Sequence, residues 1–63
     1  MARILIVDDD YDFVSGVKTV LESANYDVSA AYSREEGMKL FEQEEPDLII
    51  LDPVLDVGLY PVF

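Results

Sequence analysis

The sequence predicts one small α/β domain in which parallel strands alternate with helices. Two short apolar runs, residues 4–7 (Ile-Leu-Ile-Val) and 48–51 (Leu-Ile-Ile-Leu), have the uninterrupted character of strands that are buried on both faces. Between them lie a stretch with helical spacing, a stretch with strand-like alternation and a second helical stretch. The order β-α-β-α-β within 63 residues leaves room for a single domain with a small core.

The first strand is followed by three aspartates, residues 8–10, and then by a predicted helix. Asp10 is a suitable N-cap, and Asp12 in the first turn complements the helix dipole. Asn25 stands where the chain needs a left-handed backbone to leave the helix, a conformation that asparagine tolerates. The apolar positions recur at spacings of three and four, which is the period of one helical face: Phe13, Val14, Val17, Val20, Leu21 and Ala24.

Residues 26–32 alternate with a period of two, which predicts a strand at the edge of the sheet with one polar face. The apolar side of this strand is expected to carry Tyr26, Val28, Ala30 and Tyr32. The polar side is expected to carry Asp27, Ser29 and Ala31.

A second helix begins after Ser33, which forms a capping box with Glu36. This helix is predicted to run to about Glu45 and to end before Pro46.

Within the second helix, Met38 and Phe41 are expected to point inward. Gly37 costs about 1 kcal/mol relative to alanine inside a helix. A glycine at this position therefore predicts close packing against a neighbouring element.

Crossovers between parallel strands are right-handed, so two crossovers that run in opposite directions place their helices on opposite faces of the sheet. With the first strand in the middle, the strand order is 2-1-3 and reverses beside that strand. Ligands of open α/β sheets bind at such a reversal, outside the carboxyl ends of the strands. The two strands that meet there end in Asp8 and Asp9 and in Asp52.

Three carboxylates at one edge repel one another, at a cost of about 4 kcal/mol per close pair at an effective dielectric of 20. A hard divalent cation removes this cost. Magnesium prefers oxygen ligands and keeps several waters, so two or three protein oxygens suffice to bind it. Asp8, Asp9 and Asp52 are therefore candidate magnesium ligands.

Two segments of this sequence resemble the receiver domain of two-component response regulators. They are residues 4–10 (Ile-Leu-Ile-Val-Asp-Asp-Asp) and residues 46–52 (Pro-Asp-Leu-Ile-Ile-Leu-Asp), and the resemblance covers about residues 3–52. It implies a flavodoxin-like fold, which is present here as a truncated half-domain. Residues 53–63 then form a divergent tail in a partial receiver domain that spans residues 1–63.

The resemblance also implies the chemistry. Asp52 matches the phosphoacceptor of the family, which receives its phosphoryl group from a sensor histidine kinase or a phosphotransfer protein. Asp8 and Asp9 match the acidic pair that holds Mg²⁺, and the backbone carbonyl of Val54 falls at the family's third protein ligand. The hydroxyl residue after the fourth strand and the lysine after the fifth strand of the family have no counterpart in these 63 residues.

Composition excludes several other classes of function. The net charge of −10 disfavours binding to nucleic acid and to anionic membranes. Cysteine and histidine are absent, so a thiolate zinc site and a disulfide framework are excluded. No apolar run has the length of a membrane span, and the N-terminus lacks the pattern of a signal peptide, which favours a cytoplasmic protein.

Two alternatives to phosphoryl reception stay open at this point. One is a non-signalling half-domain that serves a structural or oligomerising role. The other is an aspartyl-phosphate hydrolase of the haloacid dehalogenase type, but that family requires a second aspartate two residues after the nucleophile, where Val54 stands. The sequence therefore predicts a signalling module and no enzyme.

The third predicted strand lies at the edge of the sheet but has no lysine and no internal proline to protect that edge. Such an edge is a template for another strand. The sequence therefore predicts a homo-oligomer, most simply a two-fold dimer, that forms through the edge of the third strand and uses the apolar tail from Leu59 to Phe63 as cover.

Overall fold

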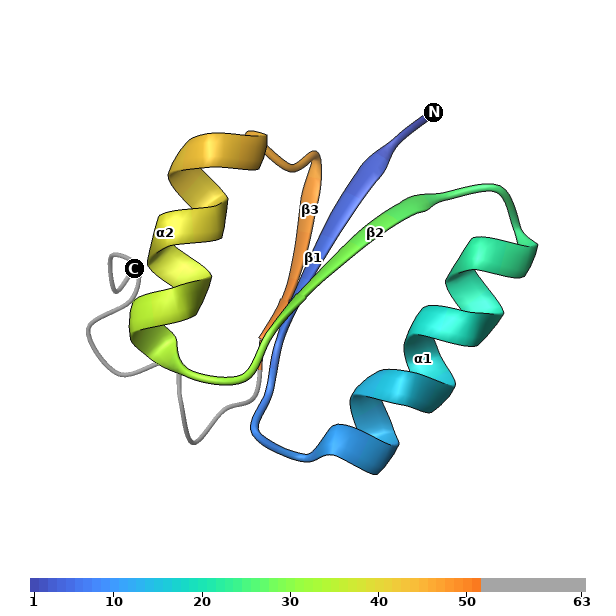
Figure 1. The fold of residues 1–63 in the computed structure, drawn as a ribbon. Coiled ribbons are helices and arrows are strands. Elements are labelled where there is room, and N and C mark those ends of the chain that lie inside the picture. Colours follow the sequence, from blue (N-terminus) through green and yellow to red (C-terminus); the bar gives the residue numbers. More distant parts are fainter. Residues whose placement is uncertain (52–63) are drawn as a thin grey trace, which may run out of the picture.

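A computed structural model of the chain describes residues 1–51 of the 63. It contains three strands and two helices in the predicted order (Figure 1). The elements are β1 (Arg3–Val7), α1 (Tyr11–Ser23), β2 (Asp27–Ala31), α2 (Arg34–Glu44) and β3 (Leu48–Leu51).

The three strands form one parallel sheet in the order β2-β1-β3. The two helices lie on opposite sides of this sheet (Figure 1). This arrangement confirms the predicted α/β class, the predicted order 2-1-3 and the truncated flavodoxin-like architecture.

The central strand β1 is the best-buried element, and its side chains alternate between two apolar clusters. On the α1 side, Ile4 and Ile6 pack with Val14 and Val28. On the α2 side, Leu5 and Val7 pack with Ala31, and with half-buried residues of α2 and β3. Burial on both faces explains why this strand reads as an unbroken apolar run.

The predicted helix ends are confirmed. The Asp10 carboxylate caps α1 by accepting a hydrogen bond from the Phe13 N–H at 3.1 Å, and Asn25 has a φ of 72°. The Ser33 hydroxyl caps α2 by accepting from the Glu36 N–H at 3.2 Å, whereas the Glu36 carboxylate accepts from the Tyr32 N–H at 2.8 Å, one residue before the N–H that a capping box uses. The sequence did not indicate that Glu45, the C-cap of α2, also has a left-handed backbone, with a φ of 48°.

Gly37 is buried where α2 comes closest to the sheet. A Cβ atom built on this residue would lie 2.9 Å from both γ-methyl groups of Val7. Carbon atoms make good contacts at about 3.5–4.0 Å, so only glycine fits here without a shift of the helix. The predicted close packing at Gly37 is confirmed.

The prediction that Met38 and Phe41 point inward is wrong. These side chains are 44% and 51% exposed. The reason is the close approach at Gly37, which turns the face of α2 that contains Gly37 and Leu40 toward the sheet and moves Met38 and Phe41 to its side.

The predicted polar face of β2 is also wrong at Ala31, which is fully buried. Helix α2 packs over this face of β2, where Ala31 joins the cluster around Leu5 and Val7. Ser29 on the same face is half-buried, and its hydroxyl donates to the Glu44 carboxylate of α2 at 3.0 Å.

Neither helix within residues 1–51 is long and apolar enough to cross a membrane.

Candidate functional site at the carboxyl edge of the sheet

Asp8 directly follows β1 and is fixed by hydrogen bonds to its neighbours. Its N–H donates to the carbonyl of Ala31 at 3.1 Å, which extends the pairing of β1 with β2 by one residue. One carboxylate oxygen of Asp8 accepts from the Asp10 N–H at 2.9 Å. The half-buried Asp8 side chain is therefore held in place by the start of α1, and it takes part in the turn between β1 and α1.

Asp9 lies between this turn and the cap of α1, and its side chain is exposed. No residue among 1–51 donates a hydrogen bond to its carboxylate. Since Asp10 caps the helix, Asp9 has no structural task in the described part of the chain. Of the two acidic residues, Asp8 is held by more hydrogen bonds and Asp9 is the more exposed.

The other predicted ligands follow β3. Leu51, the last residue of β3, pairs with Val7, the last residue of β1. The predicted acceptor Asp52 and the predicted carbonyl ligand of Val54 lie outside the described residues. Within residues 1–51, no group of three acidic side chains could hold a metal ion. The structure thus describes the Asp8 and Asp9 half of the predicted site.

The donor chemistry of this half suits magnesium. Asp8 and Asp9 offer carboxylate oxygens. The sequence contains no histidine and no cysteine, so neither imidazole nitrogen nor thiolate sulfur competes with these oxygens as a ligand. These two residues could supply part of an oxygen shell and leave the remaining positions to water and other oxygens.

A stacked aromatic pair that was not predicted from the sequence borders the same edge. The rings of Tyr11 and Tyr32 have centroids 4.3 Å apart and planes inclined at 28°. Tyr11 opens α1 and Tyr32 follows β2, so the stack links the two loops at the carboxyl end of the sheet. The available signals were a tyrosine directly after the predicted cap Asp10 and a tyrosine at the end of the predicted strand 26–32.

Arg3 lies at the opposite edge, at the amino end of β1. Its guanidinium donates to the carbonyl of Glu44 at 2.9 Å and lies 3.6 Å from the Asp27 carboxylate. Its backbone N–H donates to the Asp47 carboxylate at 2.8 Å. Arg3 is therefore a structural residue that cannot reach the acidic pair.

Comparison with known proteins identifies the family. The family model for the response regulator receiver domain matches residues 4–58 of this chain. That match covers all five described elements, from β1 to β3.

Individual relatives agree with this assignment. The alkaline phosphatase synthesis transcriptional regulatory protein PhoP of Bacillus subtilis is 45% identical over 53 residues, which are 84% of this chain and 22% of that protein. The DNA-binding dual master transcriptional regulator RpaA of Synechocystis is 47% identical over 55 residues, or 87% of this chain and 23% of the relative. The regulatory protein VanR of Enterococcus faecium is 38% identical over 53 residues, or 84% of this chain and 23% of the relative.

The chain thus spans less than a quarter of the length of these relatives. The matched residues 4–58 nevertheless cover most of this chain, and the sheet has the strand order expected for the family. The chain therefore belongs to the response regulator receiver domain family.

Proposed function

We propose that this chain is a phosphoryl-accepting receiver module of a two-component phosphorelay, with Asp52 as the acceptor. The observation that carries the proposal is the pairing of Val7 with Leu51. These residues directly precede Asp8 and Asp52 in the chain, so the two acid-bearing segments leave neighbouring strands at the same edge of the sheet. Ligands of open α/β sheets bind at that edge.

In the proposed reaction, a carboxylate oxygen of Asp52 attacks the phosphorus of a phosphohistidine on the donor protein. The bond from phosphorus to the imidazole nitrogen breaks as the new bond to oxygen forms, and the imidazole keeps the electron pair. Asp8 and Asp9, with the carbonyl of Val54, would hold Mg²⁺, which when bound neutralises charge on the phosphoryl oxygens. The hydrogen bond from Asp10 would keep Asp8 oriented for this task.

Receiver domains interact with histidine kinases or phosphotransfer proteins, and we propose a protein of this kind as the phosphoryl donor. They are signalling modules, and we propose no enzymatic activity for this chain. We also propose that residues 1–63 act in the cytoplasm. On their net charge of −10, we propose that they bind neither nucleic acid nor an anionic membrane. We also propose that residues 1–63 form a partial receiver domain in which residues 53–63 are a divergent tail.

The test is incubation with acetyl phosphate and magnesium, followed by intact mass measurement and peptide mapping. We expect an adduct of one phosphoryl group on the peptide that contains Asp52, and its loss in Asp52→Ala. Asp12→Asn is the matched control, because Asp12 is an exposed carboxylate in the first turn of α1 and should leave the adduct unchanged. An adduct that survives Asp52→Ala would refute the assignment.

Beryllofluoride distinguishes this function from that of a non-signalling structural half-domain. It mimics a phosphoryl group on a carboxylate, so it should bind the wild-type chain with magnesium and fail to bind Asp52→Ala. A folded chain that does not bind beryllofluoride would favour the non-signalling structural half-domain.

We further propose that the chain by itself forms a homo-oligomer through the outer edge of β3. Within residues 1–51, β3 has a strand on one side only. Its first residue, Leu48, is 54% exposed, and β3 contains no charged residue. An apolar edge of this kind pairs readily with another strand.

A further inference from the structure

The stack of Tyr11 on Tyr32 joins two loops that are far apart in the sequence. The ring centroids lie 4.3 Å apart, and the ring planes are inclined at 28°. Tyr11 is the first residue of α1, and Tyr32 directly follows β2. The stack therefore connects the loop between β1 and α1, which contains Asp8 and Asp9, to the loop between β2 and α2.

Tyr32 is the better-anchored partner of the stack. Its half-buried side chain packs against the core cluster on the α1 side of the sheet. Its N–H donates to the Glu36 carboxylate, in the first turn of α2, at 2.8 Å. The carbonyl of the preceding residue, Ala31, accepts from the Asp8 N–H at 3.1 Å. Core packing and these two hydrogen bonds hold the chain around Tyr32 in place.

Tyr11 depends more on the stack. Its side chain is 67% exposed, and the buried residue of α1 is Val14, three residues later. The terminal turns of helices open at little cost in free energy. The ring contact therefore holds the first turn of α1 at a point that the packing of Val14 does not reach.

The charge of this segment gives an uncharged contact particular weight. Four of the five residues from 8 to 12 are aspartates, and Tyr11 is the exception. Carboxylates this close in the chain repel one another and favour a more open loop. The attraction between two stacked aromatic rings does not depend on those charges, so it opposes the opening of the loop.

Two contacts thus lie on either side of the acidic pair. On one side, the Asp8 N–H is bonded to Ala31, and on the other, the ring of Tyr11 lies on Tyr32. Within this short span, the Asp10 N–H donates to the Asp8 carboxylate at 2.9 Å. That hydrogen bond requires a closed loop, so it reports on the arrangement of the acidic pair.

We propose that the Tyr11–Tyr32 stack positions Asp8 and Asp9 for magnesium by holding the start of α1 against the loop that follows β2. The two tyrosines are then positioning residues, which act on the metal through the loop. The inference rests on the proposed function, because it concerns the metal assigned there to the acidic pair.

The first test is free of metal. Hydrogen exchange of single amides, measured by NMR on the full chain, should be about two- to tenfold faster at Asp10 in Tyr11→Ala than in the wild type, the range expected for one aromatic pair. The Asp47 amide, which donates to the Arg3 carbonyl at the opposite edge, should keep its rate. Tyr11 is exposed, so the fold is retained in this variant.

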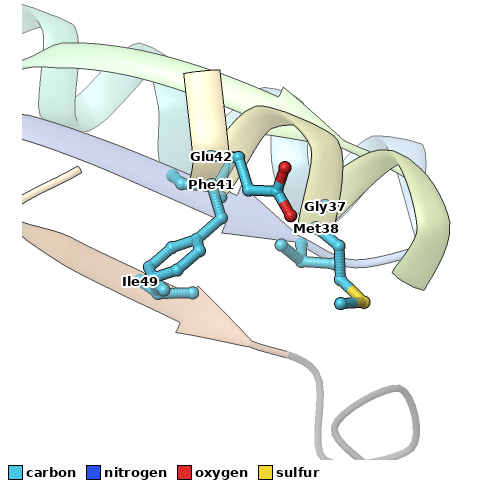
Figure 2. A pocket seen from close by; sticks show the side chains of 7 residues that line it. Gly37, Met38, Phe41, Glu42 and Ile49 are labelled. Atoms are coloured by element: carbon cyan, nitrogen blue, oxygen red, sulfur yellow. The ribbon is translucent and has the colours of Figure 1, made fainter. Parts of the chain in front are cut away.

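Three further variants show whether the ring contact itself is responsible. Tyr11→Phe keeps the ring and should keep the wild-type rate at Asp10. Tyr26→Ala removes a partly exposed tyrosine at the amino edge of the sheet. Phe41→Ala removes a half-exposed ring of α2 that faces Ile49 on the other side of the sheet (Figure 2). Both alanine controls should leave exchange at Asp10 unchanged.

The second test is a magnesium titration, followed through the amide chemical shifts of Asp8 and Asp9. The apparent affinity of a site falls with the fraction of molecules in the binding conformation. Tyr11→Ala should therefore bind magnesium at least about twofold more weakly than the wild type. Tyr11→Phe, Tyr26→Ala and Phe41→Ala should bind it with wild-type affinity.

Three results would overturn the positioning role and leave the proposed function standing. The first is unchanged exchange at Asp10 in Tyr11→Ala. The second is equally faster exchange at Asp10 and Asp47, which would show that the stack only stabilises the fold as a whole. The third is wild-type magnesium affinity in Tyr11→Ala. If the wild-type chain itself does not bind magnesium, the metal in the proposed function is refuted, and the positioning role is refuted with it.

Discussion

The two glycines of the helices differ sharply in their surroundings. At Gly37 a Cβ atom would approach Val7 to 2.9 Å, whereas at Gly16 no atom outside its own helix and immediate neighbours lies within 4 Å of such a Cβ. Val7 is fully buried and β-branched, so it has little freedom to move away. Replacement of glycine by alanine should therefore have opposite effects on the stability of the fold at the two positions.

We expect Gly37→Ala to destabilise the fold by about 1–3 kcal/mol, the usual cost of overpacking a core. Gly16→Ala should stabilise it by up to about 1 kcal/mol through helix propensity. Urea unfolding of the two variants, followed by circular dichroism, measures both effects. A Gly37→Ala chain as stable as Gly16→Ala would show that α2 can move away from the sheet at little cost.

The acidic pair gives a second prediction for individual residues. If Asp8, Asp9 and Asp52 share a magnesium ion of millimolar affinity, about 10 mM magnesium should stabilise the fold by about 1.4 kcal/mol through mass action. Thermal melts with magnesium, compared with sodium at matched ionic strength, measure this gain. Asp9→Asn should remove most of it, because Asp9 has no hydrogen-bonding role among residues 1–51.

Equal melting midpoints in magnesium and sodium would rule out the metal site. Asp12→Asn should keep the magnesium effect, because Asp12 lies within α1, beyond its cap. A loss of the effect in this control as well would point to general screening of the net charge of −10.

At the scale of single elements, α2 has an unusual end. Its C-cap, Glu45, has a left-handed backbone with a φ of 48°, which is costly for a side chain other than glycine or asparagine. Glu45→Asn should therefore be about 1 kcal/mol more stable than Glu45→Gln, since the two variants remove the same charge and differ in tolerance of this conformation. Thermal unfolding of the pair measures the difference, and equal stability would mean that the end of α2 relaxes in solution.

Most elements could be predicted from the sequence because their signals are local. The caps at Asp10 and Ser33 and the left-handed Asn25 follow from the chemistry of single side chains, and each is present. The apolar runs of β1 and β3 and the reversal of strand order beside β1 follow from burial and from the handedness of crossovers.

The features that the sequence did not predict depend on how the elements pack. The exposure of Met38 and Phe41 is set by the contact of Gly37 with Val7, which fixes the rotation of α2 on the sheet. Burial of Ala31 depends on the same helix. At the candidate site, the position of Asp8 and Asp9 after β1 was predictable, whereas the hydrogen bond from Asp10 to Asp8 was not, because it depends on the conformation of the turn.

At the scale of the whole molecule, the open edge of β3 predicts self-association. Sedimentation at micromolar concentration should give the mass of a dimer, and the dimer should become stronger at higher salt, because two copies with a net charge of −10 repel each other. Leu48→Lys should give a folded monomer, since a lysine on an edge strand blocks pairing with other strands and Leu48 is already half exposed.

Val20→Lys is the control for this experiment, because it places the same charge on the exposed surface of α1. It should leave the dimer intact. A folded wild-type monomer at all salt concentrations would refute pairing through β3.

The hydrogen bonds of Arg3 have a consequence for the order in which the sheet opens. At the amino edge, this residue links β1 to β2 through Asp27 and to the start of β3 through Asp47, whose own N–H donates back to the Arg3 carbonyl at 2.8 Å. At the carboxyl edge, Asp8 and Asp9 follow β1, and no ion pair between residues of 1–51 links the strands there. Local opening should therefore begin at the carboxyl edge, so the amide of Asp8 should exchange with deuterium faster than the amides of Asp27 and Asp47. Arg3→Met should abolish this difference between the exchange rates of the two edges. The carboxyl edge would then no longer be the first part of the sheet to admit water.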